Sequence, residues 1–174
     1  MKKGNKRVEQ EIYKEKEIAN FHIPRWEELP NRDLYLDQVV TLVNTSLEPL
    51  TNLNINSSRE ASTLTKTMIN NYVKGNLIDA PYKKKYSKTQ LAKLFVICIL
   101  KQVYSMNEIQ SLINTALSLS TIQESYDRFC MRFEEALECT YTQKDFSPDD
   151  CSQLFISVLL SCTYKLYVQH SIKE

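Results

Sequence analysis

The sequence predicts a largely helical fold, and two observations support this prediction. Only two glycines and five prolines occur among 174 residues, which leaves little material for the tight turns of a many-stranded sheet. Hydrophobic residues make up 43% of the chain, and in several segments they recur at helical spacing after a capping residue. We therefore expect an all-α protein with a sizeable buried core.

The chain is expected to begin with a charged arm, followed by an extended strap. Residues 1–20 are charged throughout and contain no apolar stretch of the kind found in secretory signals, so a cytoplasmic location is expected. Residues 21–33 contain two prolines and alternate aromatic with charged residues. This pattern favours a strap that packs on the domain through Phe21, Ile23 and Trp26.

A first helix is predicted to start at Asp33, whose side chain can cap it. Residues 44–63 are rich in Asn, Ser and Thr and contain Pro49, which predicts a loop. The apolar residues of the first helix fall mostly on one face: Leu34, Leu36, Val39, Val40, Leu42 and Val43.

The next predicted helix, residues 65–75, separates its apolar and polar residues cleanly. Gly75 and Asn76 are the two residue types that best tolerate left-handed backbone geometry, and they are expected to end it. The apolar half consists of Leu64, Met68, Ile69, Tyr72 and Val73. The polar half consists of Lys66, Thr67, Asn70, Asn71 and Lys74.

A basic turn and a long apolar helix follow. Residues 79–86 contain Lys83, Lys84 and Lys85 between two tyrosines. Ser87 with Gln90 then forms a capping box for a buried helix that is expected to reach Val103. The order of two helices, a basic turn and a further helix predicts a winged helix-turn-helix, with 65–75 as recognition helix and 79–86 as wing.

The C-terminal part is predicted to be a helical bundle. Capping boxes at Ser105 and Thr121 start two helices, the second ending near Leu137, and residues 139–146 are expected to form a loop. Ser147 as cap and Pro148 at the first position predict the last helix. Its apolar stripe could close the bundle or form a dimer seam, and the pattern favours bundle closure. We also predict a homodimer through the C-terminal helices. The stripe consists of Leu154, Phe155, Val158, Leu159, Cys162 and Leu166.

Charge is distributed by region. Residues 59–102 carry nine Lys/Arg against two Asp/Glu, whereas the flanking regions have balances of −1 and −5. A basic centre beside an acidic C-terminal region favours a polyanionic partner such as double-stranded DNA. Positive charge gathered on one face would favour DNA binding, whereas dispersed charge would favour a helical module that binds another protein.

The stretch 72–113 resembles the DNA-binding domain of MerR-type transcription regulators. The resemblance consists of Tyr72, Asn76, Leu77 and Ile78, then Lys84, Lys85, Tyr86 and Ser87, then Leu91, then Ser105, Glu108 and Ile109. It implies a winged helix-turn-helix that binds DNA. The chain departs from that family at Asn70 and Asn71, where Arg and Tyr are usual, and at Asn76, which takes the place of the helix-ending glycine.

Residues 21–117 also resemble a family of bacterial proteins known only as a domain of unknown function. This second resemblance includes the strap beginning at Ile23 and the helix beginning at Thr65. Together the patterns predict three parts: an arm (1–20), a MerR-like winged helix-turn-helix domain (21–117) and a C-terminal helical extension (118–174). The resemblance implies a fold more firmly than an activity.

A DNA-binding transcriptional regulator is the function that these patterns favour. The alternative is a helical protein–protein interaction module that keeps the fold without binding DNA. The residues expected to contact DNA are Lys66, Thr67, Asn70, Asn71, Lys74, Lys83, Lys84 and Lys85.

No catalytic, metal or cofactor site is expected. His22 and His170 are the only histidines and lie almost a full chain length apart, and no phosphate-binding loop or metal-ligand spacing occurs. The five cysteines form no CxxC pair and read as buried free thiols. Neither a membrane span nor a small-molecule ligand is indicated.

Overall fold

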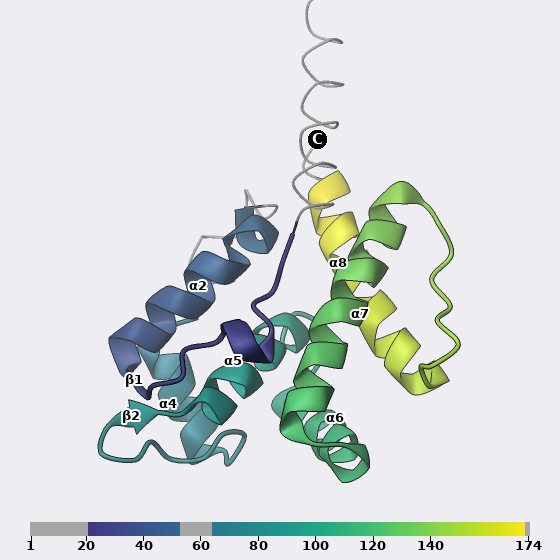
Figure 1. Cartoon of the computed structure of the whole chain (residues 1–174). Helices are drawn as coiled ribbons and strands as arrows, with labels where there is room; N and C mark the ends of the chain where they lie inside the picture. Colours follow the sequence, from purple (N-terminus) through teal and green to yellow (C-terminus); the bar gives the residue numbers. More distant parts are fainter. Residues whose placement is uncertain (1–20, 53–63, 173–174) are drawn as a thin grey trace, which may run out of the picture.

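The computed structural model describes residues 21–52 and 64–172 (Figure 1). The predicted arm, and residues 53–63 of the predicted loop, lie outside the described residues. The described chain is mainly helical, as predicted, and its strands β1 and β2 form a two-stranded antiparallel sheet. The all-α prediction is therefore corrected: the described chain is mainly helical but also contains this small sheet.

The strap is extended up to the 3-10 helix η1 (Trp26–Glu28), and Phe21 and Ile23 are buried as predicted. Strand β1 (Leu34–Tyr35) comes next, so Asp33 does not cap a helix. Helix α2 (Leu36–Asn52) begins after it, and the Gln38 side chain accepts the Tyr35 backbone N–H at 3.0 Å.

The predicted loop from Asn44 is wrong as far as residue 52, because α2 continues through Pro49 to Asn52. Composition favoured a loop, but apolar spacing continues: Val43, Leu47 and Leu50 are all buried. The helical spacing of buried residues therefore outweighed the Asn, Ser and Thr content of this segment.

Helix α4 (Lys66–Lys74) matches the predicted helix 65–75, with Thr65 as its cap and Gly75 at its end. Strand β2 (Lys85–Tyr86) lies within the predicted basic turn and pairs with β1 in the register Leu34 to Tyr86. Helix α5 (Lys88–Leu100) has the predicted Ser87–Gln90 capping box but ends before Val103. Nine of its thirteen residues are buried, which makes it the central element of the core.

Helices α6 (Met106–Leu119) and α7 (Ile122–Thr142) both carry the predicted capping boxes. Helix α7 is longer than predicted, because Thr140 and Tyr141 still face the core and Gln143, with a φ of 55°, ends the helix. The last helix, α8 (Gln153–Ser171), starts later than predicted: Ser152 caps it, and Ser147 and Pro148 belong to the preceding connection. In that connection Phe146 is buried.

Helix α5 lies between α2 on one side and the pair α7 and α8 on the other (Figure 1). Phe95 and Leu94 of α5 are fully buried, as is Phe133 of α7. The predicted stripe of α8 mostly faces α7: Val158, Leu159, Cys162 and Leu166 are buried, while Leu154 is exposed. These four residues therefore close the bundle within one chain.

All five cysteines are free thiols, and Cys98, Cys130 and Cys162 are buried, as predicted. Cys139 and Cys151 are only partly covered. Burial raises the pKa of Cys98 to about 11 and that of Cys130 to about 12, from an ordinary value of 9.0. Because the thiolate is the reactive form, these buried thiols are protonated and unreactive at neutral pH.

Candidate nucleic-acid interface

The outer face of α4 consists of the five polar residues that the sequence predicted. Ile69 and Tyr72 are buried on the opposite side of the helix. The Thr65 hydroxyl caps the helix by accepting the Met68 backbone N–H at 3.2 Å. The exposed face consists of Lys66, Thr67, Asn70, Asn71 and Lys74. We call it the α4 polar face.

The C-terminal end of α4 adopts a Schellman motif. The N–H of Leu77 donates to the Tyr72 carbonyl at 2.9 Å, and the N–H of Asn76 donates to the Val73 carbonyl at 3.1 Å. Asn76 takes the left-handed conformation, with a φ of 56°, and Gly75 does not. Asn76 therefore adopts the left-handed conformation that glycine usually adopts at this position of a helix end. The chain then returns to the core, where Leu77 is buried.

Residues Tyr82 to Tyr86 form a tight hairpin, which we call the lysine hairpin. The N–H of Lys85 donates to the Tyr82 carbonyl at 2.9 Å, and the two residues form an antiparallel bridge. Lys83 and Lys84 at its tip both have positive φ, 47° and 65°, as a type I′ turn requires. Both side chains are exposed.

Aromatic rings flank two of these lysines. The Lys83 ammonium lies 5.2 Å from the centre of the Tyr82 ring, and the Lys85 ammonium lies 5.0 Å from that of Tyr35 in β1. Tyr86 is buried and anchors the hairpin, and burial raises its pKa. The hairpin therefore has a fixed base in the core and a charged tip in solvent.

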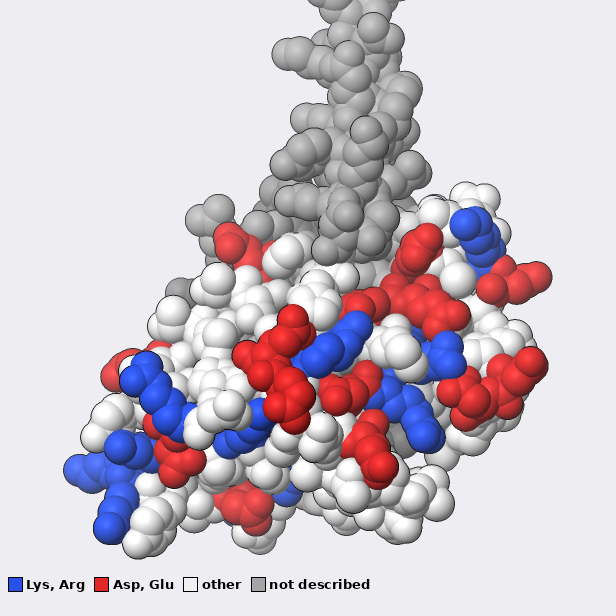
Figure 2. Space-filling model, viewed as in Figure 1, with Lys and Arg blue, Asp and Glu red and all other residues white. Residues whose placement is uncertain are grey.

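The start of the α4 polar face and the lysine hairpin both lie near the start of α2. Lys66, the first residue of α4, forms an ion pair with Asp37 near the start of α2. Strand β1 runs directly into the start of α2 and pairs with β2 of the hairpin. In Figure 2, basic side chains gather at the lower left, where Figure 1 places the hairpin.

The remaining positive charge of the basic centre is spread over other surfaces. Lys88 packs over the Trp26 ring at 5.2 Å and donates to Asn31 at 2.9 Å. Lys93 forms an ion pair with Asp79 at 3.3 Å. The predicted basic centre therefore divides into a hairpin group and lysines with local partners.

Lys101 is another basic residue that turns away from solvent. Burial lowers its pKa, and its ammonium lies 4.0 Å from the Met68 sulfur. Its charge therefore adds little to the surface beside the hairpin.

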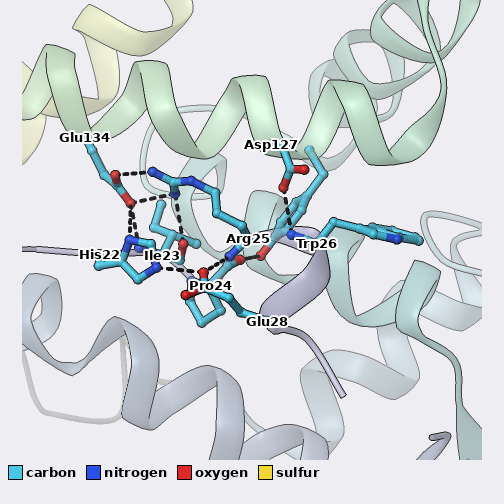
Figure 3. A network of polar contacts seen from close by, with 9 residues as sticks. His22, Ile23, Pro24, Arg25, Trp26, Glu28, Asp127 and Glu134 are labelled. Carbon is cyan, nitrogen blue, oxygen red and sulfur yellow. Dashed lines mark hydrogen bonds and ion pairs between the residues drawn. The ribbon is translucent and has the colours of Figure 1, made fainter. Parts of the chain in front are cut away.

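A second polar cluster joins the strap to α7, and sequence reasoning missed it (Figure 3). Glu134 accepts hydrogen bonds from both terminal nitrogens of Arg25 and, at 2.6 Å, from the Ile23 backbone N–H. Asp127 accepts the Trp26 backbone N–H at 2.7 Å. The Tyr126 hydroxyl donates to the Pro24 carbonyl at 2.7 Å.

This strap clamp, formed by Arg25, Asp127 and Glu134 with the strap backbone, has a structural role. Its carboxylates are engaged by the guanidinium and by backbone donors, which leaves little capacity for a substrate. The Glu134 hydrogen bond raises the pKa of Arg25. The sequence pattern showed acidic residues on a helix but gave no signal for partners more than 100 positions away.

Within residues 21–52 and 64–172, no three His, Cys, Asp or Glu side chains are placed to hold a metal ion. Over the same ranges, every helix is too short or too polar to cross a bilayer.

The geometry thus defines a mainly helical protein in which a basic hairpin and the start of the α4 polar face both lie near the start of α2. A comparison with protein-family models matched residues 24–129 to the family described as Domain of unknown function (DUF1836). Because that match spans more than half of the chain, the protein belongs to this family. The matched region includes α4, the hairpin and most of the strap, and it ends within α7.

Searches of curated proteins and of solved structures found no match.

Proposed function

We propose that this protein is a bacterial, cytoplasmic transcriptional regulator that binds double-stranded DNA through a MerR-like winged helix-turn-helix. In this proposal α2 and α4 form the helix-turn-helix, α4 is the recognition helix and residues 79–86 are the wing. The observation that carries the proposal is that the exposed polar face of α4 starts near the same end of α2 as the lysine hairpin.

The residue types on the two surfaces suit the two kinds of contact that DNA offers. Asn70 and Asn71 can each bond the N6 and N7 atoms of adenine in the major groove, which admits one helix. The hairpin lysines can bind phosphates on the adjacent backbone, since such contacts need charge and not base recognition. Lys66 and Lys74 border the asparagines.

The conformation of the hairpin tip gives independent support. A two-residue turn with positive φ at both positions favours Asn-Gly, because residues with a larger side chain are strained there. This chain has Lys83 and Lys84 at those positions instead. Two exposed lysines at a strained tip suggest that their charge contributes to function more than it costs in stability.

One observation favours the alternative, a protein–protein interaction module. Lys66, Lys88 and Lys93 each have a carboxylate partner within 4.0 Å, which reduces the positive potential available to phosphate. Lys83 and Lys84 have no such partner among the described residues. If the protein binds DNA, removal of the Lys83 and Lys84 charges should weaken that binding. If it is a protein–protein interaction module, their removal should not affect DNA binding.

The test is DNA binding measured by fluorescence anisotropy of a mixed-sequence duplex over a range of salt concentrations. The variant Lys83→Ala/Lys84→Ala should bind more weakly, and the slope of log K against log salt should flatten by about two units for two lost phosphate contacts. The control Lys144→Ala/Lys165→Ala removes the same charge from exposed positions at the C-terminal end. If both variants change the slope equally, the hairpin does not contact DNA.

A further inference from the structure

Helices α5, α6, α7 and α8 enclose an apolar cavity of about 370 Å³. This volume equals that of about a dozen water molecules and lies within the range of small-molecule sites. Its walls are made by Val96, Leu100, Leu112, Ala116, Phe129 and Val158. No single segment of sequence contains this set, which explains why the sequence indicated no ligand.

The cavity is open to solvent, and two leucines of its lining are themselves exposed. Leu119 at the end of α6 is 81% exposed, and Leu154 at the start of α8 is 57% exposed, and both line the cavity. A ligand that covers these exposed apolar side chains removes their surface from water, which favours binding.

Almost all the polar side chains that line the cavity already have partners in the protein. The Tyr126 hydroxyl donates to the Pro24 carbonyl, and the Ser120 and Ser125 hydroxyls bond each other at 2.7 Å. The Thr115 hydroxyl donates to a backbone carbonyl at 2.9 Å. These groups are therefore not free to bind a ligand.

The charged side chains at the rim are occupied in the same way, with one exception. Asp150 accepts a hydrogen bond from Arg132 at 2.6 Å, and Lys93 pairs with Asp79 at 3.3 Å. Arg128 is exposed, lines the cavity and forms no hydrogen bond or ion pair with a described residue.

Glu124 lies one turn before Arg128 on α7, and the pKa of Glu124 is lowered by the hydrogen bonds from Thr121 and, to a lesser extent, by the Arg128 charge. Its carboxylate is held by the hydroxyl and backbone N–H of Thr121, at 2.8 Å and 3.0 Å. The hydrogen-bond donors of Arg128 therefore remain available at the mouth of the cavity, although its charge interacts with that of Glu124.

We propose that this cavity binds a small monocarboxylate with an apolar body of about ten carbons. The guanidinium of Arg128 would bind the carboxylate through two parallel hydrogen bonds, and the apolar body would fill the space between the four helices. One guanidinium without a hydrogen-bond partner among the described residues favours one anionic group, and the limited volume favours a free small molecule over a partner helix. The proposal is independent of DNA binding.

Isothermal titration of the full chain with decanoate tests the proposal, with 1-decanol as the uncharged probe. Decanoate should bind saturably with one site and at least about tenfold more tightly than 1-decanol. Arg128→Gln should weaken decanoate binding about tenfold and leave 1-decanol binding unchanged. Lys165→Gln, which removes an exposed cation from α8 outside the cavity lining, should change neither.

Two substitutions in the cavity itself complete the test. Ala116→Phe should fill the space and abolish binding of both probes, with an unchanged circular dichroism spectrum confirming the fold. Leu119→Glu lies at an exposed position that tolerates charge, and it should weaken decanoate by repulsion even if Ala116→Phe fails to fold. Absence of saturable decanoate binding at millimolar concentration, or equal affinity of wild type and Arg128→Gln for decanoate, would overturn the proposal.

Discussion

Lys83 and Lys84 occupy backbone positions that Asn and Gly fill at lower energy. Their φ values of 47° and 65° belong to a type I′ turn. The replacement Lys83→Asn/Lys84→Gly should therefore raise the free energy of unfolding by about 1 kcal/mol, since it relieves strain at both positions. Urea denaturation measures this.

The same variant should bind DNA less well, because it loses two phosphate contacts. Lys83→Arg/Lys84→Arg keeps both the charge and the strain and is the matched control for both measurements. If Lys83→Asn/Lys84→Gly changes the free energy of unfolding and the affinity for DNA in the same direction, the lysines do not serve DNA binding through their charge.

Several residues show what sequence alone could predict. The α4 polar face follows from local periodicity, so all five of its residues were predicted and are exposed. Asn44 was assigned to a loop, yet from within α2 its amide bonds the backbone N–H and carbonyl of Leu64 at 2.8 and 2.9 Å. Such a contact between distant positions has no local signature.

At the scale of elements, helix starts were more predictable than helix ends. Three capping boxes, beginning at Ser87, Ser105 and Thr121, were read correctly because their chemistry lies within four residues. The end of α7 depends on packing against α8, which continues to bury Thr140 and Tyr141. The Thr140 and Thr163 hydroxyls bond each other at 2.8 Å across that contact.

The capping carboxylates should make stability sensitive to acid. Hydrogen bonds from Ser105 and Thr121 lower the pKa of Glu108 and Glu124 below their ordinary 4.5. A carboxyl group with a lowered pKa stabilises the fold fully above that ordinary value and loses its contribution as the pH falls through the folded-state pKa.

The variant Glu108→Gln/Glu124→Gln keeps the acceptors without titrating, so its urea midpoint should fall less between pH 5 and pH 3 than that of the wild type. Glu138→Gln, at an exposed position without a cap, is the control. Parallel acid profiles for the wild type and the double variant would contradict the capping account.

The strap clamp should contribute measurably to folding. Arg25 and Glu134 side chains are 27% and 18% exposed, so their pairing is stronger than that of a surface ion pair. Glu134→Ala should lower the free energy of unfolding by about 2–3 kcal/mol, because it also removes the acceptor for the Ile23 N–H.

Glu138→Ala, one turn further along α7 and exposed, should cost less than about 0.5 kcal/mol. A double-mutant cycle with Arg25→Ala measures the coupling directly. Strict additivity of Arg25→Ala and Glu134→Ala would show that the clamp adds no stability of its own.

At the scale of the whole molecule, the dimer prediction needs a different seam. The buried part of the predicted α8 stripe packs within the chain, so removal of α8 would expose the core instead of testing assembly. The outer face of α8 exposes Tyr164 and Val168, and Ile172 follows directly after the helix at the same four-residue spacing, with exposures of 51–76%.

We therefore expect a dimer through this outer face, and Tyr164→Lys/Val168→Glu should convert it to a monomer. Sedimentation velocity at micromolar concentration measures both proteins, and Lys165→Ala on a neighbouring position is the control. A wild type that sediments as a monomer rules out this seam.

The protein is a mainly helical member of the DUF1836 family, and the central claim about its function is that it binds DNA at a defined sequence. The most direct measurement is selection of bound sequences from a random double-stranded DNA library by the purified full chain. We predict enrichment of a defined site by the wild type. Asn70→Ala/Asn71→Ala should lose that enrichment while it retains salt-dependent binding to unrelated DNA. A wild-type protein that enriches no sequence, or an enriched site that the double variant selects equally well, would contradict the account.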